Sequence, residues 1–364
     1  MRELMSVKRF AKESPELYKV FKDYADNVFA VERNVKGKSF SAMSLDDKEK
    51  AINKMFAEEI ARRSKVEVSA YDGDYAHYCE NPIVKSFADS IFDRMIDMIL
   101  PEALNTSVGL IAEIAYIDWG DTAKFDLDNN ALYNVYKAGY RQKNGLFQQL
   151  EGQTVTVAPE NRQVSLTFTL FEILTGRKSI AKEAMKAVRS IELEMVDEAW
   201  DAFTGAVNHA NTPNELKVKN YTQATAVGLA DKVTAWNGGK KAVFAGTPLS
   251  LSKIVPTDAN YRYTLDDDMV RLGYVKDFMT YDVIPTPNFA DRKSTTYGLK
   301  LPDNKIYVVS PASDKIIKIA VGGSLTVPSG QFENANMSQT HTINKAWGIV
   351  CATNSICGQI SLQW

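Results

Sequence analysis

Polar and apolar residues follow a helical period at the start of the chain. Up to residue 65 the sequence is mixed in charge and helix-like. The segment SLDDKEKAINKMFAEEIARRSK begins with Ser44, a candidate helix cap, and closes with basic residues, as the helix dipole favours. Its apolar positions form only a narrow stripe, which predicts a helix that covers another part of the protein. A second amphipathic helix is expected over 86–100, ended by Pro101.

The period then changes to that of β-strands, with turn signals between alternating segments. In GQTVTVAPENRQVSLTFTLFEI, hydroxyl side chains alternate with apolar ones on both sides of Pro159-Glu160-Asn161. This pattern predicts a long two-stranded hairpin with half-exposed strands. Because an isolated hairpin is only marginally stable in water, we expect it to lie on a partner.

The strongest helical pattern follows, in TGRKSIAKEAMKAVRSIELEMVDEAWDAF. Its apolar residues recur on one face from Ile180 to Phe203. At 1.5 Å per residue, some 25 residues span roughly 37 Å, which is longer than most helices in globular domains. The segment therefore predicts a rigid strut.

From about residue 218 the pattern is that of an α/β layer. A helix ends at a glycine cap in NGG, KAVFAG is a buried strand, and Thr247 and Pro248 begin another helix. Further on, KIYVVSPASDKIIKIAVGGSLTVPSG places two strand-like runs around an Asp-Lys turn. The chain closes with the β-rich segment QTHTINKAWGIVCATNSICGQISL.

Composition narrows the function classes. The 364 residues are 45% hydrophobic and 24% charged with a formal net charge of −2, so a contact with nucleic acid would be local and weak. Cys79, Cys351 and Cys357 cannot form a disulfide framework and are expected to be buried free thiols in a reducing cytosol. The sequence shows neither a signal peptide nor a membrane-length apolar run, which predicts a protein made and folded in the cytoplasm.

Candidate chemistry is sparse. The sequence contains no phosphate-binding loop, nucleotide-binding glycine motif, HExxH or GxSxG. Two SxxK matches, at Ser179 and Ser250, lack the companion motifs of their families. The run Asp266–Asp268 could bind a divalent cation but is better explained as a solvated first helical turn. The histidines, His77, His209 and His341, have no clustered metal-binding or catalytic partners in the sequence. We therefore predict that the protein has no catalytic, cofactor-binding or metal-binding residues and is not an enzyme.

Basic and aromatic residues interleave in YNVYKAGYRQKNGLF. This composition suits stacking on single-stranded nucleic acid, and it equally suits a β-loop that docks on neighbouring subunits. The adjoining hairpin favours docking. The candidate subunit-contact residues are Tyr140, Arg141, Lys143 and Phe147.

The order of these segments resembles the major capsid protein of tailed double-stranded DNA bacteriophages, which has the Hong Kong 97-type fold. The resemblance lies in the arrangement of the quoted segments from about residue 66 onward. It implies an α+β fold with these parts: 1–65 as N-terminal helical arm, 66–110 as start of the peripheral domain, 111–163 as extended E-loop, 164–217 as peripheral domain with the spine helix, 218–314 as α/β axial domain, 315–348 as peripheral-domain hairpin and tip loop, and 349–364 as return to the axial domain.

The same resemblance implies a structural protein of the virion that builds an icosahedral shell around the phage genome, without a cofactor. Its implied partners are copies of itself in pentamers and hexamers, a portal protein, scaffolding and decoration proteins, and packaged DNA in weak, non-specific contact. Assembly would take place in the bacterial cytoplasm, away from membranes. Residues 1–22 hold six basic and three acidic residues, which makes them candidates for the inner face.

Two features of some family members are not expected here. Some members begin with a long scaffolding segment that a protease removes. The N-terminal helices here are short, so we expect a separate scaffolding protein or none, and no cleavage of such a segment. Nothing in the sequence supports a cross-link between Lys143 and Asn354. Two alternatives stay open: an encapsulin-like shell around protein cargo, and a cytoplasmic enzyme whose site joins Asp121, His209 and Asp267.

Overall fold

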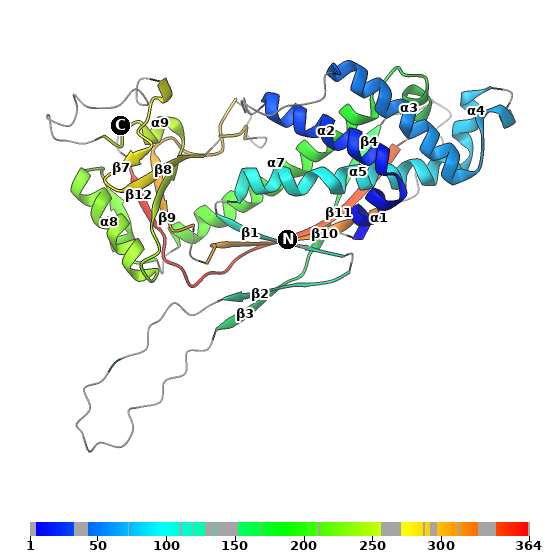
Figure 1. The fold of residues 1–364 in the computed structure, drawn as a ribbon. Coiled ribbons are helices and arrows are strands. Elements are labelled where there is room, and N and C mark those ends of the chain that lie inside the picture. Colours follow the sequence, from blue (N-terminus) through cyan, green and yellow to red (C-terminus); the bar gives the residue numbers. More distant parts are fainter. Residues whose placement is uncertain are drawn as a thin grey trace, which may run out of the picture.

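Helices and strands build an elongated body with a separate α/β unit at one end (Figure 1). The structure is a computed structural model and describes residues 5–32, 43–71, 73–109, 111–118, 120–127, 135, 152–167, 169–209, 212–255, 271–286, 288–291, 297–311, 314–326 and 340–362. A two-stranded ribbon projects from the body on its own (Figure 1).

The first part of the chain is helical. Its elements are α1 (Met5–Glu13), α2 (Pro15–Glu32), α3 (Leu45–Ser64), the 3-10 helix η1 (Val68–Tyr71), α4 (Tyr75–Glu80) and α5 (Pro82–Val108). The predicted cap of α3 is confirmed, because Ser44 Oγ accepts a hydrogen bond from the Asp47 N–H. The prediction that Pro101 ends the second helix is wrong: α5 starts earlier and runs through this residue to Val108. Packing holds the helix together there, since Leu100 and Leu104 on either side are buried in the core.

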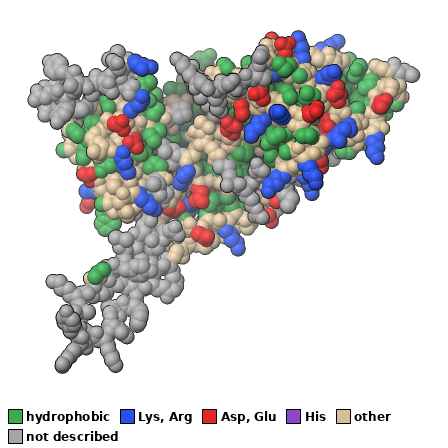
Figure 2. Space-filling model, viewed as in Figure 1, with side chains coloured by type: hydrophobic (Ala, Val, Ile, Leu, Met, Phe, Trp, Pro, Cys, Tyr) green, Lys and Arg blue, Asp and Glu red, His purple; other side chains and the backbone are tan. Residues whose placement is uncertain are grey.

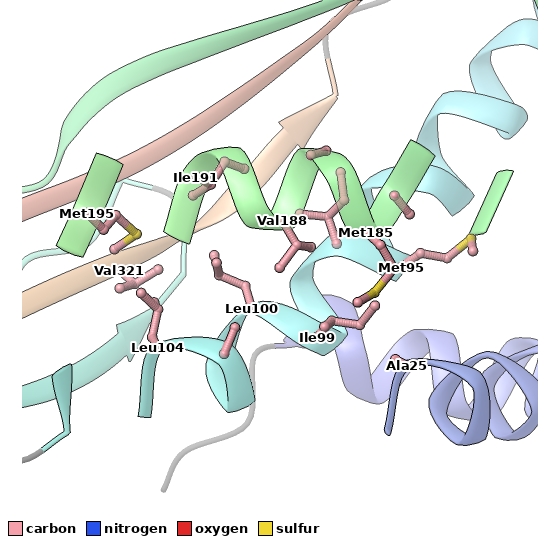
Figure 3. Packing of buried hydrophobic residues seen from close by; sticks show 14 of the residues in the cluster. Ala25, Met95, Ile99, Leu100, Leu104, Met185, Val188, Ile191, Met195 and Val321 are labelled. Atoms are coloured by element: carbon pink, nitrogen blue, oxygen red, sulfur yellow. The ribbon is translucent and has the colours of Figure 1, made fainter. Parts of the chain in front are cut away.

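The long strut is confirmed as α7 (Ile180–Asn208), preceded by the short α6 (Leu170–Leu174). It packs along α5, and Figure 3 shows Met185 and Val188 of α7 facing the apolar side chains of α5. Helices α1 to α3 add their own buried residues to this core. As predicted, the narrow apolar stripe of α3 covers other elements, here α5 and α7.

A four-stranded sheet lies against these helices. Its order is β1 (Ala112–Ile117), β10 (Ile317–Thr326), β11 (Thr340–Cys351) and β4 (Glu160–Thr167), with β1 parallel and the other pairs antiparallel. The predicted pairing of the C-terminal strands is confirmed by β10 and β11. Alternate residues of β10, namely Ile317, Ile319 and Val321, face the helical core.

The predicted hairpin around Pro159 is wrong. Its two strands exist, as β3 (Gln153–Val157) and β4, but they do not pair with each other. β3 pairs with β2 (Ala123–Leu127) to form the projecting ribbon, and β4 joins the four-stranded sheet through β11. The alternation located both strands, but partners far away in the sequence decided the pairing.

The α/β unit is built on a six-stranded mixed sheet. Its strand order is β5 (Lys217–Lys219), β12 (Gly358–Ser361), β9 (Lys305–Val309), β6 (Val243–Gly246), β8 (Tyr281–Pro285) and β7 (Asp277–Phe278). The described residues of this unit include the helices η2 (Asn214–Leu216), α8 (Gln223–Trp236) and α9 (Pro248–Leu251). The buried strand β6, the glycine turn after α8 and the Thr247 cap of α9 are as predicted.

The two strand-like runs around Asp314-Lys315 lie in different sheets: β9 belongs to the six-stranded sheet and β10 to the four-stranded sheet. The turn between them is therefore a connection between the two parts of the molecule. Among the residues that the structure describes, no helix combines the length and the apolar character that crossing a membrane requires.

Candidate functional site

The β2–β3 ribbon is the element that leaves the body, and its base is packed against the four-stranded sheet. Ala123, Phe125 and Val157 of the ribbon are each less than 5% exposed. They form a separate apolar cluster with Ala320 of β10, supported by Ala115 and Ile117 of β1. The ribbon is thus held at its base by burial of apolar side chains.

Small residues on the sheet allow this close approach. A Cβ atom on Gly348 of β11 would lie 2.7 Å from the backbone oxygen of Ala158 and 3.0 Å from Val157 Cγ1. The backbone that follows β3 therefore lies directly on β11, with no room for a side chain. We call Ala115, Ala320 and Gly348 the ribbon seat.

The N-terminal helices are held to α3 and α5 by a polar network as well as by their apolar faces. Ser14 Oγ donates to Glu59 at 2.6 Å, and Arg63 Nη2 donates to Ser14 Oγ at 2.7 Å. Glu13 accepts from both Arg63, at 2.9 Å, and Arg94, at 2.6 Å. A surface pocket of about 330 Å³ lies beside the network, and Glu13, Ser14 and Glu59 are among the residues that line it.

Acid should loosen this network. The hydrogen bond from Arg94 lowers the pKa of Glu13. Burial alone would raise the pKa of Glu59, but hydrogen bonds from Arg62, Ser14 and Arg63 outweigh it, so this pKa also lies below 4.5. A carboxylate with a depressed pKa stabilises the folded state above its unfolded pKa and loses that contribution as the pH falls through its folded value. We expect the urea concentration at the unfolding midpoint to decrease as the pH falls below about 4.5. This decrease should be smaller in Glu59→Gln.

The control for this prediction is Glu58→Gln, because Glu58 is the neighbouring residue and its side chain is 64% exposed. Urea midpoints of the three proteins would be measured between pH 7 and about pH 3. Parallel pH profiles for the wild type and Glu59→Gln would show that this carboxylate does not carry the acid response.

The α/β unit carries large apolar side chains at its surface. Trp236 at the end of α8 is 71% exposed, Leu249 of α9 is 52% exposed, and Tyr297 and Leu299 of the loop before β9 are also exposed. Elsewhere in the view of Figure 2, Lys and Arg alternate with Asp and Glu over the helical layers, and neither sign dominates. Large exposed apolar groups are candidates for contact with other proteins.

The four predicted contact residues, Tyr140, Arg141, Lys143 and Phe147, lie outside the residues that the structure describes. The same holds for Asp266–Asp268. Within the described ranges, no group of three His, Cys, Asp or Glu residues is placed to hold a metal ion.

The described histidines lie apart from any such cluster. His77 is exposed, and Nδ1 lies 2.6 Å from Asp74 Oδ2; this contact raises the pKa of His77. His209 follows the end of α7 and is exposed. Asp121 is exposed in the turn between β1 and β2.

The prediction for the cysteines is partly wrong. Cys79 is buried and free, as expected, and burial raises its pKa to about 12. Cys357 is half-buried, whereas Cys351 is exposed because it is the last residue of β11, where the sheet ends. All three thiols are free.

Sequence reasoning missed the ribbon seat and two buried lysines within the four-stranded sheet, one in β10 and one in β11. Lys318 and Lys345 have fully buried side chains, although lysine in an alternating strand suggests a solvated face. Gly348, within a strand-like run, was the one available signal, since glycine inside a strand often marks a close approach of another backbone.

One family model matches most of the chain. A family model described as "SPbeta prophage-derived putative capsid protein YonB" matches residues 21–361. None of the curated proteins matches the chain. Among solved structures, the chain is similar to the mature capsid of bacteriophage PhiM1, at 10% identity and a TM-score of 0.44 over 70% of this chain and 86% of that chain. It is also similar to the capsid of cyanophage P-SCSP1u, at 8% identity and a TM-score of 0.47 over 70% and 88% of the two chains.

Proposed function

This chain belongs to the YonB family of prophage-derived capsid proteins, and we propose that many copies of it assemble into the icosahedral shell around a phage double-stranded DNA genome. The family match over residues 21–361 is the observation that carries this proposal. The protein is a structural component of the virion. Its function as we propose it needs neither a cofactor nor catalysis.

The position of the exposed surfaces supports a protein that functions by contacting other copies of itself. The projecting ribbon and the exposed apolar side chains of the α/β unit lie on different parts of an elongated molecule (Figure 1). Such surfaces become buried when copies associate, each contributing a modest interface. We propose that the segment between β2 and β3 makes such contacts through Tyr140, Arg141, Lys143 and Phe147. These contacts would repeat with the symmetry of pentamers and hexamers.

Further partners follow from the same proposal. A portal protein, and scaffolding and decoration proteins, would complete a shell assembled in the bacterial cytoplasm. For packaged DNA, the proposed contact is the N-terminal layer. Lys8, Arg9 and Lys12 are exposed on α1, whereas the nearby Glu13 is engaged by Arg63 and Arg94. This leaves a locally basic surface that suits weak, non-specific phosphate contacts.

Negative-stain electron microscopy tests the proposal. The protein would be expressed alone and together with its neighbouring genes, and we expect closed icosahedral particles tens of nanometres across. A monodisperse monomer of 40.5 kDa under both conditions would contradict it. The contents of purified particles separate the two kinds of shell, because a phage capsid would hold DNA and an encapsulin-like shell would hold protein cargo.

A further inference from the structure

Lys318 joins three elements at the base of the ribbon. Its side chain is 0% exposed and lies on the face of β10 that carries Ala320, opposite the face in the helical core. Nζ donates to Glu113 Oε2 of β1 at 2.5 Å and also to Asp314, just before β10. The ammonium group lies 5.8 Å from the ring centroid of Phe125 in β2, within the range of a cation–π interaction.

Asp314 extends this junction to the connections between the two sheets. It lies in the connection from β9 to β10, whereas Thr353 and Asn354 lie in the connection from β11 to β12. The Thr353 hydroxyl donates to the Asp314 backbone oxygen at 3.3 Å, and the Asn354 N–H points to Asp314 Oδ2 at 3.5 Å. The Asn354 side-chain amide lies 3.5 Å from the backbone oxygen of Leu127, at the end of β2.

Burial explains why this junction has one geometry. A lysine ammonium without water must keep its charged partners, because an unpaired buried charge is strongly unfavourable. Lys318 can keep Glu113, Asp314 and the ring of Phe125 together only if β1, the ribbon and the connection to the six-stranded sheet stay in their present positions. The ribbon seat alone would fix the distance of the ribbon from the sheet, but not its relation to the α/β unit.

We propose that Lys318 is a positioning residue that sets the direction of the ribbon relative to the six-stranded sheet, and thereby the curvature of the assembled shell. The proposal rests on the proposed function, in which the ribbon side and the α/β unit present separate surfaces that become buried when copies associate. When one side chain fixes the angle between two contact surfaces, it also fixes how successive subunits are inclined.

The test compares Lys318→Met with Lys300→Met. Lys300 is the matched control, because it also bridges two carboxylates, at 2.5 Å to Asp197 and 2.8 Å to Asp201, and its side chain is 15% exposed. Amide hydrogen exchange of the unassembled subunit would be followed in β2 and β3. We expect exchange about ten-fold faster in Lys318→Met and unchanged in Lys300→Met.

Particle diameters measured by electron microscopy form the second readout. Lys318→Met should give shells with a diameter distribution that is shifted or broadened relative to the wild type. Wild-type exchange and diameters in Lys318→Met, or equally accelerated exchange of β2 and β3 in both variants, would overturn the proposal.

Glu113→Gln covers the case in which Lys318→Met does not fold. The Glu113 side chain is 51% exposed, so this change removes one partner without opening the core. It should accelerate exchange in the ribbon in the same direction, and unchanged exchange would count against the proposal. If the wild-type protein forms no shells at all, the proposed function fails, whereas the exchange comparison still tests the role of Lys318 in the ribbon.

Discussion

Replacing Asp97 by alanine should lower the free energy of unfolding by about 3–5 kcal/mol, the largest stability loss we expect from one substitution. Asp97 of α5 is 1% exposed, and its Oδ1 lies 2.5 Å from Nζ of Lys345, which is 0% exposed. Ser6 of α1 donates to Asp97 Oδ2 at 2.8 Å. The pair therefore links the helical core, the sheet and the N-terminal layer. Truncation of Asp97 would leave the buried ammonium of Lys345 without this carboxylate and away from water.

Urea denaturation would measure this loss, with Glu58→Ala as the control. Glu58 pairs with Lys54 at 3.8 Å, but both side chains are more than half exposed. An exposed pair four residues apart on a helix contributes only about 0.3–0.5 kcal/mol. A double replacement, Asp97→Leu with Lys345→Met, should recover most of the lost stability, because it removes both charges and keeps the volume filled. Equal losses for Asp97→Ala and Glu58→Ala would refute the assignment.

Local patterns predicted the elements well where local chemistry decides. The apolar stripe located α7, Ser44 capped α3, and Thr247 began α9, because each signal depends on residues within one or two turns. Pro101 misled the prediction, since its local effect was weaker than the burial of the helix on both sides. Helix boundaries that packing decides cannot be read from the proline alone.

Pairing over long sequence distances could not be predicted. β4 alternates as a hairpin strand should, but its partner β11 lies far along the chain, and the alternation is the same for either partner. Lys318 shows the same limit at the candidate site. In KIIKIA it occupies the polar face of β10, and only the ribbon, which is distant in sequence, makes that face buried. The proposed contact residues between β2 and β3 stay a prediction.

Replacing Gly348 by leucine should strongly reduce the yield of closed shells while leaving the helical core folded. The new Cβ would lie 2.7 Å from the Ala158 oxygen, and this neighbour is backbone that cannot rotate away. The ribbon would have to leave its seat, and overpacking of this kind costs typically about 1–3 kcal/mol. Because the same strain recurs in every subunit of a shell, we expect the yield of closed particles to fall at least about ten-fold.

Gly228→Ala is the matched control, because a Cβ on this residue of α8 would meet nothing within 4 Å and alanine favours a helix. Particle yield would be measured by sedimentation and electron microscopy, and folding by the helical circular dichroism signal. Gly348→Leu should keep its helical signal, because the core between α5 and α7 lies on the other face of the sheet from the ribbon. Normal yields of closed shells from Gly348→Leu would mean that the position of the ribbon does not govern assembly. A collapse of the helical signal would mean that the seat supports the fold itself.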